Sequence, residues 1–469
     1  MSDARGQTSR PWNPEHYRHA VHSPEAKLPQ ADLVFFLLDT VPHLDLSRFY
    51  ALYEEETRGA PPFDPQMMVC LLLYASCVGV FASRKIAQAC ERTLAFLAIV
   101  GADRPDFRTI SDVRTRPLTA FCDVFVAGLR IAGEAGVVKL GNGSTDGSTL
   151  PGHASRHKAM SSGSMKQEVA RIREAIAAVG TPAYHQDAED AAALGSRRGD
   201  AWPAEWARRE DRLATSEAAM QRLEARANAE AEAARQRRAD VEAERQRTGT
   251  KRRGRAPTEV DETPEDKAQM RFTDPELPSM QRNNKGWDYG GHAQVSVDEA
   301  YQIIVACDVT VEANDKQQAA PMAQLTVAHV EPAGIARPTD AAGAVQKRPG
   351  TSDSGYDSEA AAKAVEQRGF EPSMAPGRQR PHVPETAEAE VLTTATARMA
   401  AQVRTPEGRA LYARRKVIVE PVFGQIKEAR GFRRFLLRGL AKIRGEGCLV
   451  CLTHNLLKIW RYTYAPITV

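Results

Sequence analysis

The spacing of apolar residues changes along the chain, and these changes divide it into segments. Residues 1–60 contain short helical patterns, and residues 61–137 have a strongly helical pattern throughout. The longest uncharged apolar run, from Met67 to Ala82, is shorter than the roughly 20 residues that a bilayer span requires, and it contains Gly79. We therefore expect a buried helix there and no membrane span.

A short β-compatible stretch follows this helical region. It reads VVKLGNGSTDGSTLPGHAS, in which glycines and short polar residues surround Asp146, and we expect an extended segment that contains this aspartate. Residues 164–284 are then charged and mostly helical, with a thin apolar seam of Leu213, Met220 and Leu223 that gives way to alanines. Such a seam predicts a long solvated helix or a weak coiled coil rather than a core.

Alternation of apolar and polar residues returns near residue 290. The segments HAQVSVD and YQIIVACDVT are separated by little more than Glu299-Ala300, which predicts an antiparallel hairpin. A helix near residues 315–330 and a strand that ends at Asp353 follow, and Asp357 or Ser358 would cap the next helix. The final segment is helical from Thr405-Pro406, where Thr would be the N-cap and Pro the first helical residue.

The order of these elements predicts an α/β protein with a mixed sheet flanked by helices. An all-helical domain precedes the sheet, and a long charged helical insertion interrupts it. We expect an N-terminal helical segment over 1–60, a helical domain over 61–137, an α/β domain made of 138–163 and 285–462, and an insertion with a linker over 164–284.

Composition adds one positive signal. Apolar residues make up 42% and charged residues 26% of the chain, as in ordinary soluble proteins. The net charge is only +3, but between Arg404 and Arg461 fourteen Lys or Arg residues stand against four glutamates. A local excess of this size predicts a polyanionic partner. The start of the chain, MSDARGQTSRPWNPEHYRH, has no apolar stretch for a signal peptide, so we expect a cytoplasmic protein.

The seven cysteines are scattered, which is typical of a reducing compartment. Cys448 and Cys451 form a CxxC, and His454 follows three residues later. No second pair of potential ligands lies nearby in the sequence, and the segment has a helical pattern. We interpret these residues as a buried helical face rather than a zinc site.

Three acids on separate predicted elements, Asp146, Asp353 and Glu420, are candidates for chemistry. Two-metal phosphoryl transfer requires hard oxygen ligands that converge from separate elements, so that two Mg²⁺ ions about 4 Å apart flank the scissile phosphate. Other acids have the same chemistry, and we interpret them as hairpin-turn or surface residues: Asp298, Asp308 and Asp315.

Four stretches strengthen the choice of these three acids: DGSTLPGHASRHKAMS from Asp146, AQVSVDEAYQIIVACDVTVEANDKQQAAPM from Ala293, SDSGYDSE around Asp353, and YARRKVIVEPVFGQIKEARGFRRF from Tyr412. Together they resemble a DDE transposase of the bacterial insertion-sequence type. The helical stretches FDPQMMVCLLLYA and SRKIAQACER resemble the N-terminal domain of these enzymes. The resemblance extends from about residue 60 to residue 460, and the charged insertion fits it least well.

This resemblance implies an RNase H-like catalytic core in which Asp146, Asp353 and Glu420 bind two Mg²⁺ ions, with Mn²⁺ as a substitute. The implied substrates are double-stranded DNA: the terminal inverted repeats and the target. The implied reaction is cleavage at the element's ends to expose 3′-OH groups, followed by their attack on target DNA. Joining two DNA ends leads us to expect a homodimer in the DNA complex.

The family's C-terminal signature, Y-x2-R-x3-E-x6-K, implies auxiliary roles for Tyr412, Arg415 and Lys427. Here four residues rather than three separate Arg415 from Glu420. On a helix that advances about 100° per residue, Lys416 shares a stripe with Glu420 and Lys427, whereas Arg415 lies about 140° from the glutamate. We hypothesise that Lys416 takes part of the arginine's role. In the alternative, Arg415 keeps that role and a local bulge absorbs the extra residue.

Basic residues in two regions are candidates for phosphate contacts, which supply sequence-independent affinity for DNA. The first group lies in the helical region, where a DNA-binding module and a bundle with solvated basic faces are both compatible with the pattern. The second group follows the predicted glutamate. The candidates are Arg84, Lys85 and Arg114 in the first group, and Arg430, Arg433, Arg434 and Arg438 in the second.

Two other functions remain open from the sequence. One is an RNase H-like nuclease that cuts DNA but does not join strands. The other is a non-catalytic DNA-binding protein derived from a transposase, against which the presence of all three acids argues.

Overall fold

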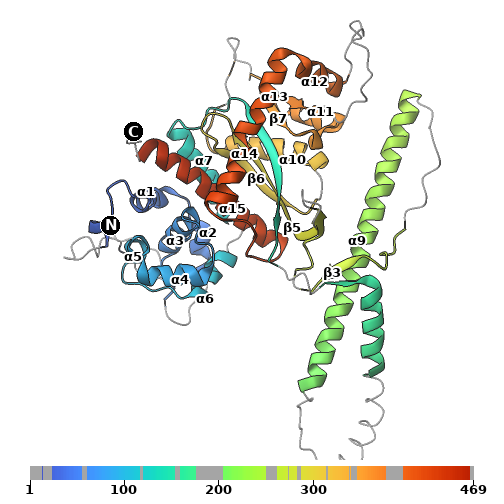
Figure 1. The fold of residues 1–469 in the computed structure, drawn as a ribbon, viewed down its shortest axis with the longest axis horizontal. Coiled ribbons are helices and arrows are strands. Elements are labelled where there is room, and N and C mark those ends of the chain that lie inside the picture. Colours follow the sequence, from blue (N-terminus) through green and yellow to red (C-terminus); the bar gives the residue numbers. More distant parts are fainter. Residues whose placement is uncertain are drawn as a thin grey trace, which may run out of the picture. The chain divides into compact units, whose positions relative to one another are not determined.

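A computed structural model describes Asn13 and residues 24–54, 61–116, 120–153, 159–175, 204–249, 261–272, 274–281, 287–312, 315–336, 339, 346–375 and 394–464. The chain divides into two compact units. One is formed by residues 1–153 and 279–469, and the other by residues 154–278. Figure 1 shows both units.

The first unit begins with a group of short helices. The longest apolar run forms α3, in which Asp64 accepts a hydrogen bond from the Gln66 amide as N-cap, and Pro65 is the first helical residue. Almost every residue of α3 is buried, which confirms the expected buried helix. The helices described before the sheet are α1 (Leu33–Thr40), α2 (Ser47–Glu54), α3 (Pro65–Cys77), α4 (Ser83–Arg92), α5 (Leu94–Val100), α6 (Phe107–Thr115) and α7 (Ala120–Glu134).

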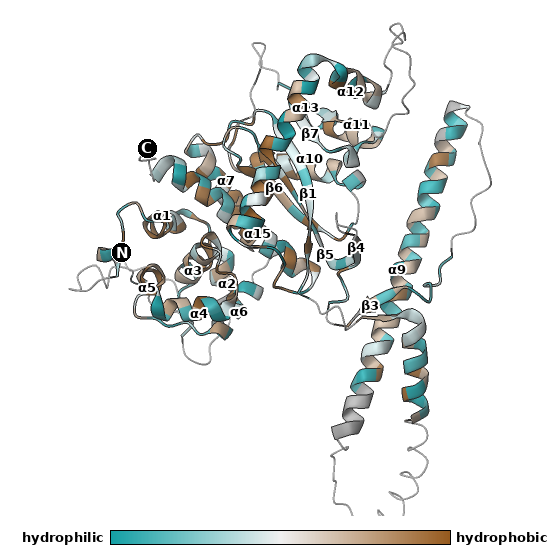
Figure 2. Cartoon of the chain, in the orientation of Figure 1, coloured by the Kyte–Doolittle hydropathy of each residue, from teal (hydrophilic) through white to brown (hydrophobic). Residues whose placement is uncertain are grey.

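A mixed sheet forms the centre of this unit. Its strands are β1 (Gly143–Pro151), β4 (Ser279–Gln281), β5 (Trp287–Asp298), β6 (Ile304–Thr310), β7 (Arg348–Ser352) and β8 (Phe370–Met374). Strand β1 pairs with β5 antiparallel and with β7 parallel, β8 pairs with β7 parallel, and β6 pairs with β5 antiparallel. The β5–β6 pair is the expected hairpin. Strand β6 is the more apolar of the two, as its colour in Figure 2 shows.

Helices from both ends of the chain cover the sheet. Those within and after it are α10 (Ala319–Val330), α11 (Glu359–Gln367), α12 (Ala395–Arg404), α13 (Pro406–Ile418), α14 (Glu420–Gly424) and α15 (Leu440–Ile459). Helices α10 and α15 both pack on β6, and α15 also packs on α3 and α7. The N-terminal helices therefore share their core with the C-terminal helix. Among the described residues, no helix is long and apolar enough to cross a membrane.

The second unit contains the long helix α9 (Ala204–Thr248) and a two-stranded antiparallel sheet of β2 (Ala159–Ser161) and β3 (Gln269–Arg271). A small core forms where Ala219 and Leu223 of α9 pack on Met165 and Met270. The expectation of a helix without a core was therefore wrong at this place, because distant residues supply the apolar partners. The first unit resumes at Ser279, where β4 pairs with β5, earlier than the expected residue 285.

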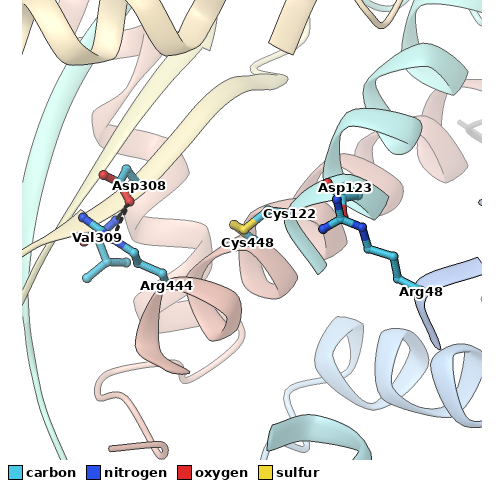
Figure 3. The surroundings of a disulfide bond; sticks show 7 residues. All are labelled: Arg48, Cys122, Asp123, Asp308, Val309, Arg444 and Cys448. Carbon is cyan, nitrogen blue, oxygen red and sulfur yellow. Dashed lines mark hydrogen bonds and ion pairs between the residues drawn. A yellow bond between two sulfur atoms is a disulfide. The ribbon is translucent and has the colours of Figure 1, made fainter. Parts of the chain in front are cut away.

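Two cysteines that are far apart in the sequence form a disulfide. Cys122 of α7 and Cys448 of α15 are bonded, with their Cα atoms 5.3 Å apart (Figure 3). The sequence did not indicate this pair, because the contact between the two helices is tertiary. Cys451 and His454 are buried on the same helix, as expected for a packed face, and His454 Nε2 lies 2.9 Å from the Gln302 carbonyl oxygen.

Candidate active site

Two of the candidate carboxylates become neighbours through the strand register. Thr145 of β1 lies opposite Ser352 of β7 in the parallel pair, and Asp146 and Asp353 each follow by one residue. Adjacent strands are about 4.8 Å apart, so Asp146, within β1, and Asp353, just after β7, lie side by side. Strand β7 has few β-branched residues. It is nevertheless hydrogen-bonded on both sides, to β1 and to β8.

Arg415 brings the third carboxylate to the first two. Its Nη1 atom lies 3.3 Å from Asp146 Oδ2, and its Nη2 atom lies 3.6 Å from Asp353 Oδ1 and 4.0 Å from Glu420 Oε1. Only 10% of the Arg415 side chain is exposed. One buried guanidinium thus faces all three acids, which arrive from β1, from the turn after β7 and from α14.

A break between two helices gives Arg415 and Glu420 this arrangement. Helix α13 ends at Ile418, Val419 lies between, and α14 begins at Glu420 with Pro421 in its first turn. The Val422 amide donates to the Val419 carbonyl, so the hydrogen bonding tightens to the three-residue spacing there. Angles counted along one continuous helix therefore do not apply to Glu420.

The hypothesis that Lys416 takes part of the arginine's role stays a prediction, but the contacts with the three acids are made by Arg415. Lys416 is exposed, whereas Arg415 is buried among the carboxylates. The extra residue in the signature is absorbed at Val419, as in the alternative of a local irregularity.

The remaining signature residues lie around the same site. The Tyr412 ring is 5.8 Å from Arg415 Cζ, and burial raises the pKa of this tyrosine. Lys427 lies in a π-helical turn, Gln425–Ala429, and its ammonium group contacts Ser148 Oγ, two residues after Asp146 on β1. Such π-helical turns are frequent at functional sites. This turn directs Lys427 toward the strand that carries the first aspartate.

The electrostatics of Asp146 reflect its position. Burial raises its pKa to about 6, and the nearby Asp353 and Asp315 carboxylates raise it as well. The Gly147 amide and Arg415 act in the opposite direction by stabilising the charged form. A cation beside Asp146 therefore favours its carboxylate form.

Asp298, Asp308 and Asp315 were interpreted above as hairpin-turn or surface residues. Two of them, Asp308 and Asp298, have protein partners away from the candidate site. Asp308 Oδ1 lies 3.1 Å from Arg444 Nε (Figure 3), and Asp298 accepts hydrogen bonds from the Lys139 and Gly141 amides. Asp315 was misjudged as a surface residue. A side chain added at Gly147 would meet Asp315 Oδ1 at 2.8 Å, so this acid lies directly beside the first candidate aspartate.

The donor chemistry of the site suits a hard divalent cation, since carboxylate oxygens are the preferred protein ligands of Mg²⁺. Among the described residues no three His, Cys, Asp or Glu side chains are arranged to hold a metal, and Arg415 stands between the acids. The residues that fit the ions by chemistry are Asp146, Asp353 and Glu420.

The basic candidates fall into two groups. Five are exposed: Arg84, Lys85, Arg433, Arg434 and Arg438. Arg433 pairs with Glu428, and Arg438 Nε donates to the His153 carbonyl at 3.1 Å. Burial lowers the pKa of His153, and the cations Arg438 and Arg434, which lie near the end of β1, lower it as well.

Arg114 and Arg430 form the second group, and their expected DNA contacts are corrected by the structure. Arg430 donates to the Ser76 and Val450 carbonyls and to Thr453 Oγ1, and 8% of it is exposed. Arg114 pairs with Glu446 in the interior. Both guanidinium groups are committed to protein partners, because buried donors require acceptors.

Two family models match this chain. Residues 378–460, which include Glu420 and its signature, match the transposase DDE domain, and residues 22–116 match the transposase domain (DUF772). Both matches are to transposase families, and together they support a DDE-type insertion-sequence transposase. No curated protein and no solved structure matches it. The transposase DDE match covers Arg415 and Lys427 as well, and the N-terminal transposase match covers α1 through α6.

Proposed function

We propose that this protein is a DNA transposase that cleaves the ends of an insertion sequence and joins the 3′-OH ends to target DNA by two-metal phosphoryl transfer. The observation that carries the proposal is the grouping of Asp146, Asp353 and Glu420 around one buried arginine. Arg415 supplies one positive charge against three carboxylates, and the remaining repulsion among the acids is relieved only where further positive charge is bound. A site for cations accounts for their grouping.

The sheet supports an RNase H-like core. Along it the strands follow the order β6, β5, β1, β7 and β8. Strand β5 runs antiparallel to both of its neighbours, β6 and β1, and the last two strands run parallel to β1. This arrangement leaves β1 in the centre, where Asp146 lies opposite Val295 of β5 and directly follows the residues that pair with β7.

In the proposed reaction Asp146, Asp353 and Glu420 hold two divalent cations, Mg²⁺ or Mn²⁺. Cations held there would supply activation of the attacking oxygen and neutralisation of charge on the departing one. Arg415, whose guanidinium group faces all three carboxylates, orients them. Lys427, Arg434 and Arg438 lie along the same end of β1 and contact the DNA backbone, where their charges supply affinity without reading sequence. Two copies of the chain act together on two DNA ends.

The proposal is tested with duplexes that carry the inverted repeats flanking the gene, in Mg²⁺ or Mn²⁺. We expect Asp146→Ala, Asp353→Ala and Glu420→Ala each to abolish cleavage while DNA binding persists. Asp308→Ala is the matched control, because that acid pairs with Arg444 outside the site. Cleavage by the triple variant would refute the proposed site.

A joining assay with labelled target DNA separates transposition from simple cutting. A transposase yields joined product from a precut 3′-OH end, whereas a nuclease of the same fold yields none. Binding without cleavage by the unmodified protein, at any Mg²⁺ or Mn²⁺ concentration, would instead indicate a non-catalytic DNA-binding protein.

A further inference from the structure

A buried chain of polar side chains lies beneath the candidate site and is not explained by the three acids. Gln294, on β5, is fully buried, and its Nε2 donates to Asp315 Oδ1 at 2.8 Å. Its Oε1 accepts a hydrogen bond from the hydroxyl of Tyr356, which is also fully buried. Burying a side-chain amide costs free energy unless its nitrogen and its oxygen both have hydrogen-bond partners. In Gln294 both atoms have one.

The chain connects the three pieces of backbone that surround the aspartates. Gln294 lies opposite Gly147 in the β1–β5 register, one residue after Asp146. Tyr356 ends the short helical turn Ser354–Tyr356, whose N-cap is Asp353, and its amide donates to the Asp353 carbonyl at 3.0 Å. Asp315 begins the turn before α10. One amide thus links the strand partner of β1 to the turn that carries Asp353.

The two glycines beside the aspartates make room for this chain. A Cβ atom at Gly147 would lie 2.5 Å from Gln294 Nε2 and 2.8 Å from Asp315 Oδ1. At Gly355 it would lie 3.5 Å from the Asp315 side chain, in ordinary contact. Asp315 therefore fills the space between the backbone segments that carry Asp146 and Asp353.

We infer that Asp315, Gln294 and Tyr356 form a positioning relay, which fixes the turn bearing Asp353 against β1 and so sets the separation of the two catalytic aspartates. The inference rests on the proposed function for its catalytic consequence. The part of the inference that concerns structure, namely that these residues fix the turn bearing Asp353, does not depend on the proposed function. Asp315 acts through its acceptor oxygen toward Gln294, and Tyr356 acts as the anchor of the turn in the core formed with Ala361, Ala362 and Met374.

The first test measures hydrogen exchange of the backbone amides in the full-length protein without DNA. Tyr356→Phe keeps the ring in the core but removes the hydroxyl, and we expect faster exchange across residues 353–357 with β1 protection unchanged. Tyr50→Phe is the matched control, since Tyr50 donates to Asp64 in the N-terminal helices at 3.1 Å. Unchanged exchange across residues 353–357 in Tyr356→Phe would overturn the relay.

The second test compares two substitutions of Asp315 in the cleavage assay. Asp315→Asn keeps an oxygen that accepts from Gln294, whereas Asp315→Ala does not. We expect Asp315→Ala to lower the cleavage rate about 10- to 100-fold, with DNA affinity unchanged, because small errors in the position of reacting groups are costly. Asp315→Asn should restore most of the rate. Equal loss in both variants would mean that the charge of Asp315 is needed, and the positioning role would be refuted.

The two tests also separate this inference from the proposed function. If the unmodified protein cleaves no DNA, the proposed function fails, while the exchange measurement still decides whether the relay fixes the turn. If the protein cleaves DNA and Tyr356→Phe behaves as unmodified in both assays, the relay fails and the proposed function stands.

Discussion

Arg114 and Glu446 form a buried ion pair that joins the N-terminal helices to the C-terminal helix. Arg114 Nη2 on α6 lies 3.0 Å from Glu446 Oε1 on α15, and 7% and 2% of the two side chains are exposed. The other carboxylate oxygen of Glu446 accepts from the Leu436 and Leu437 amides. Burial raises the pKa of Glu446 and lowers that of Arg114, and each partner offsets the shift of the other.

Removing one member of this pair should leave the other charged and buried. We expect Arg114→Met to lower the free energy of unfolding by about 3–5 kcal/mol, measured by urea denaturation. Arg48→Met is the matched control, because Arg48 pairs with Asp123 at 2.8 Å but both side chains are more than half exposed (Figure 3). That control should cost less than about 1 kcal/mol. Equal losses in the two variants would show that burial does not decide the effect.

The break at Val419 predicts opposite results for two adjacent basic residues. Arg415→Ala should reduce strand cleavage about 100-fold, a loss typical of removing one preorganised charge from an active site. Lys416→Ala should cleave at nearly the unmodified rate, since Lys416 is exposed. Both variants should retain folding by circular dichroism. The reverse order of activities would restore the lysine to the arginine's role.

His454 predicts a dependence of stability on pH. Burial, together with the nearby cations Arg430, Lys458 and Arg461, lowers its pKa to about 3 although the Gln302 carbonyl acts in the opposite direction, so it is neutral in the folded protein. In the unfolded chain its pKa is about 6.5. The unfolded state therefore gains a proton as the pH falls below about 6.5, and stability declines from there toward pH 3 by up to about 1.4 kcal/mol per pH unit.

The measurement for His454 compares slopes rather than absolute stabilities. Denaturation of His454→Gln between pH 4 and 7 should show a shallower slope than the unmodified protein. His43→Gln is the control, because the His43 side chain is exposed, and this variant should show the slope of the unmodified protein. Identical slopes in all three proteins would show that His454 does not titrate in this window.

The exposed cations near the end of β1 predict a salt effect on DNA binding. Arg434→Ala should weaken binding about equally for all sequences and reduce the slope of log affinity against log salt by about one unit. Arg48→Ala, an exposed arginine that pairs with Asp123, should leave the slope unchanged. A slope unaltered by Arg434→Ala would remove this residue from the phosphate-contacting surface.

Local signals in the sequence determined several elements of this protein. Thr405 is the N-cap of α13 with Pro406 in its first position, and Ser358 caps α11 by accepting from the Ala361 amide. The β5–β6 hairpin and the buried α3 were also predictable. Caps, turns and apolar periodicity act over a few residues, so a short stretch of sequence contains all the information they need.

The arrangement of the site was decided only by the tertiary structure. Val419 interrupts the helix where the sequence pattern continues, so Arg415 rather than Lys416 reaches the acids. Asp315 and Gln294 meet because β6, which ends five residues before Asp315, pairs antiparallel with β5. Burial of a charged residue depends on which distant surface covers it, and no local pattern encodes that surface. For this reason the sequence placed Arg114 and Arg430 on DNA, and the fold places them in the interior.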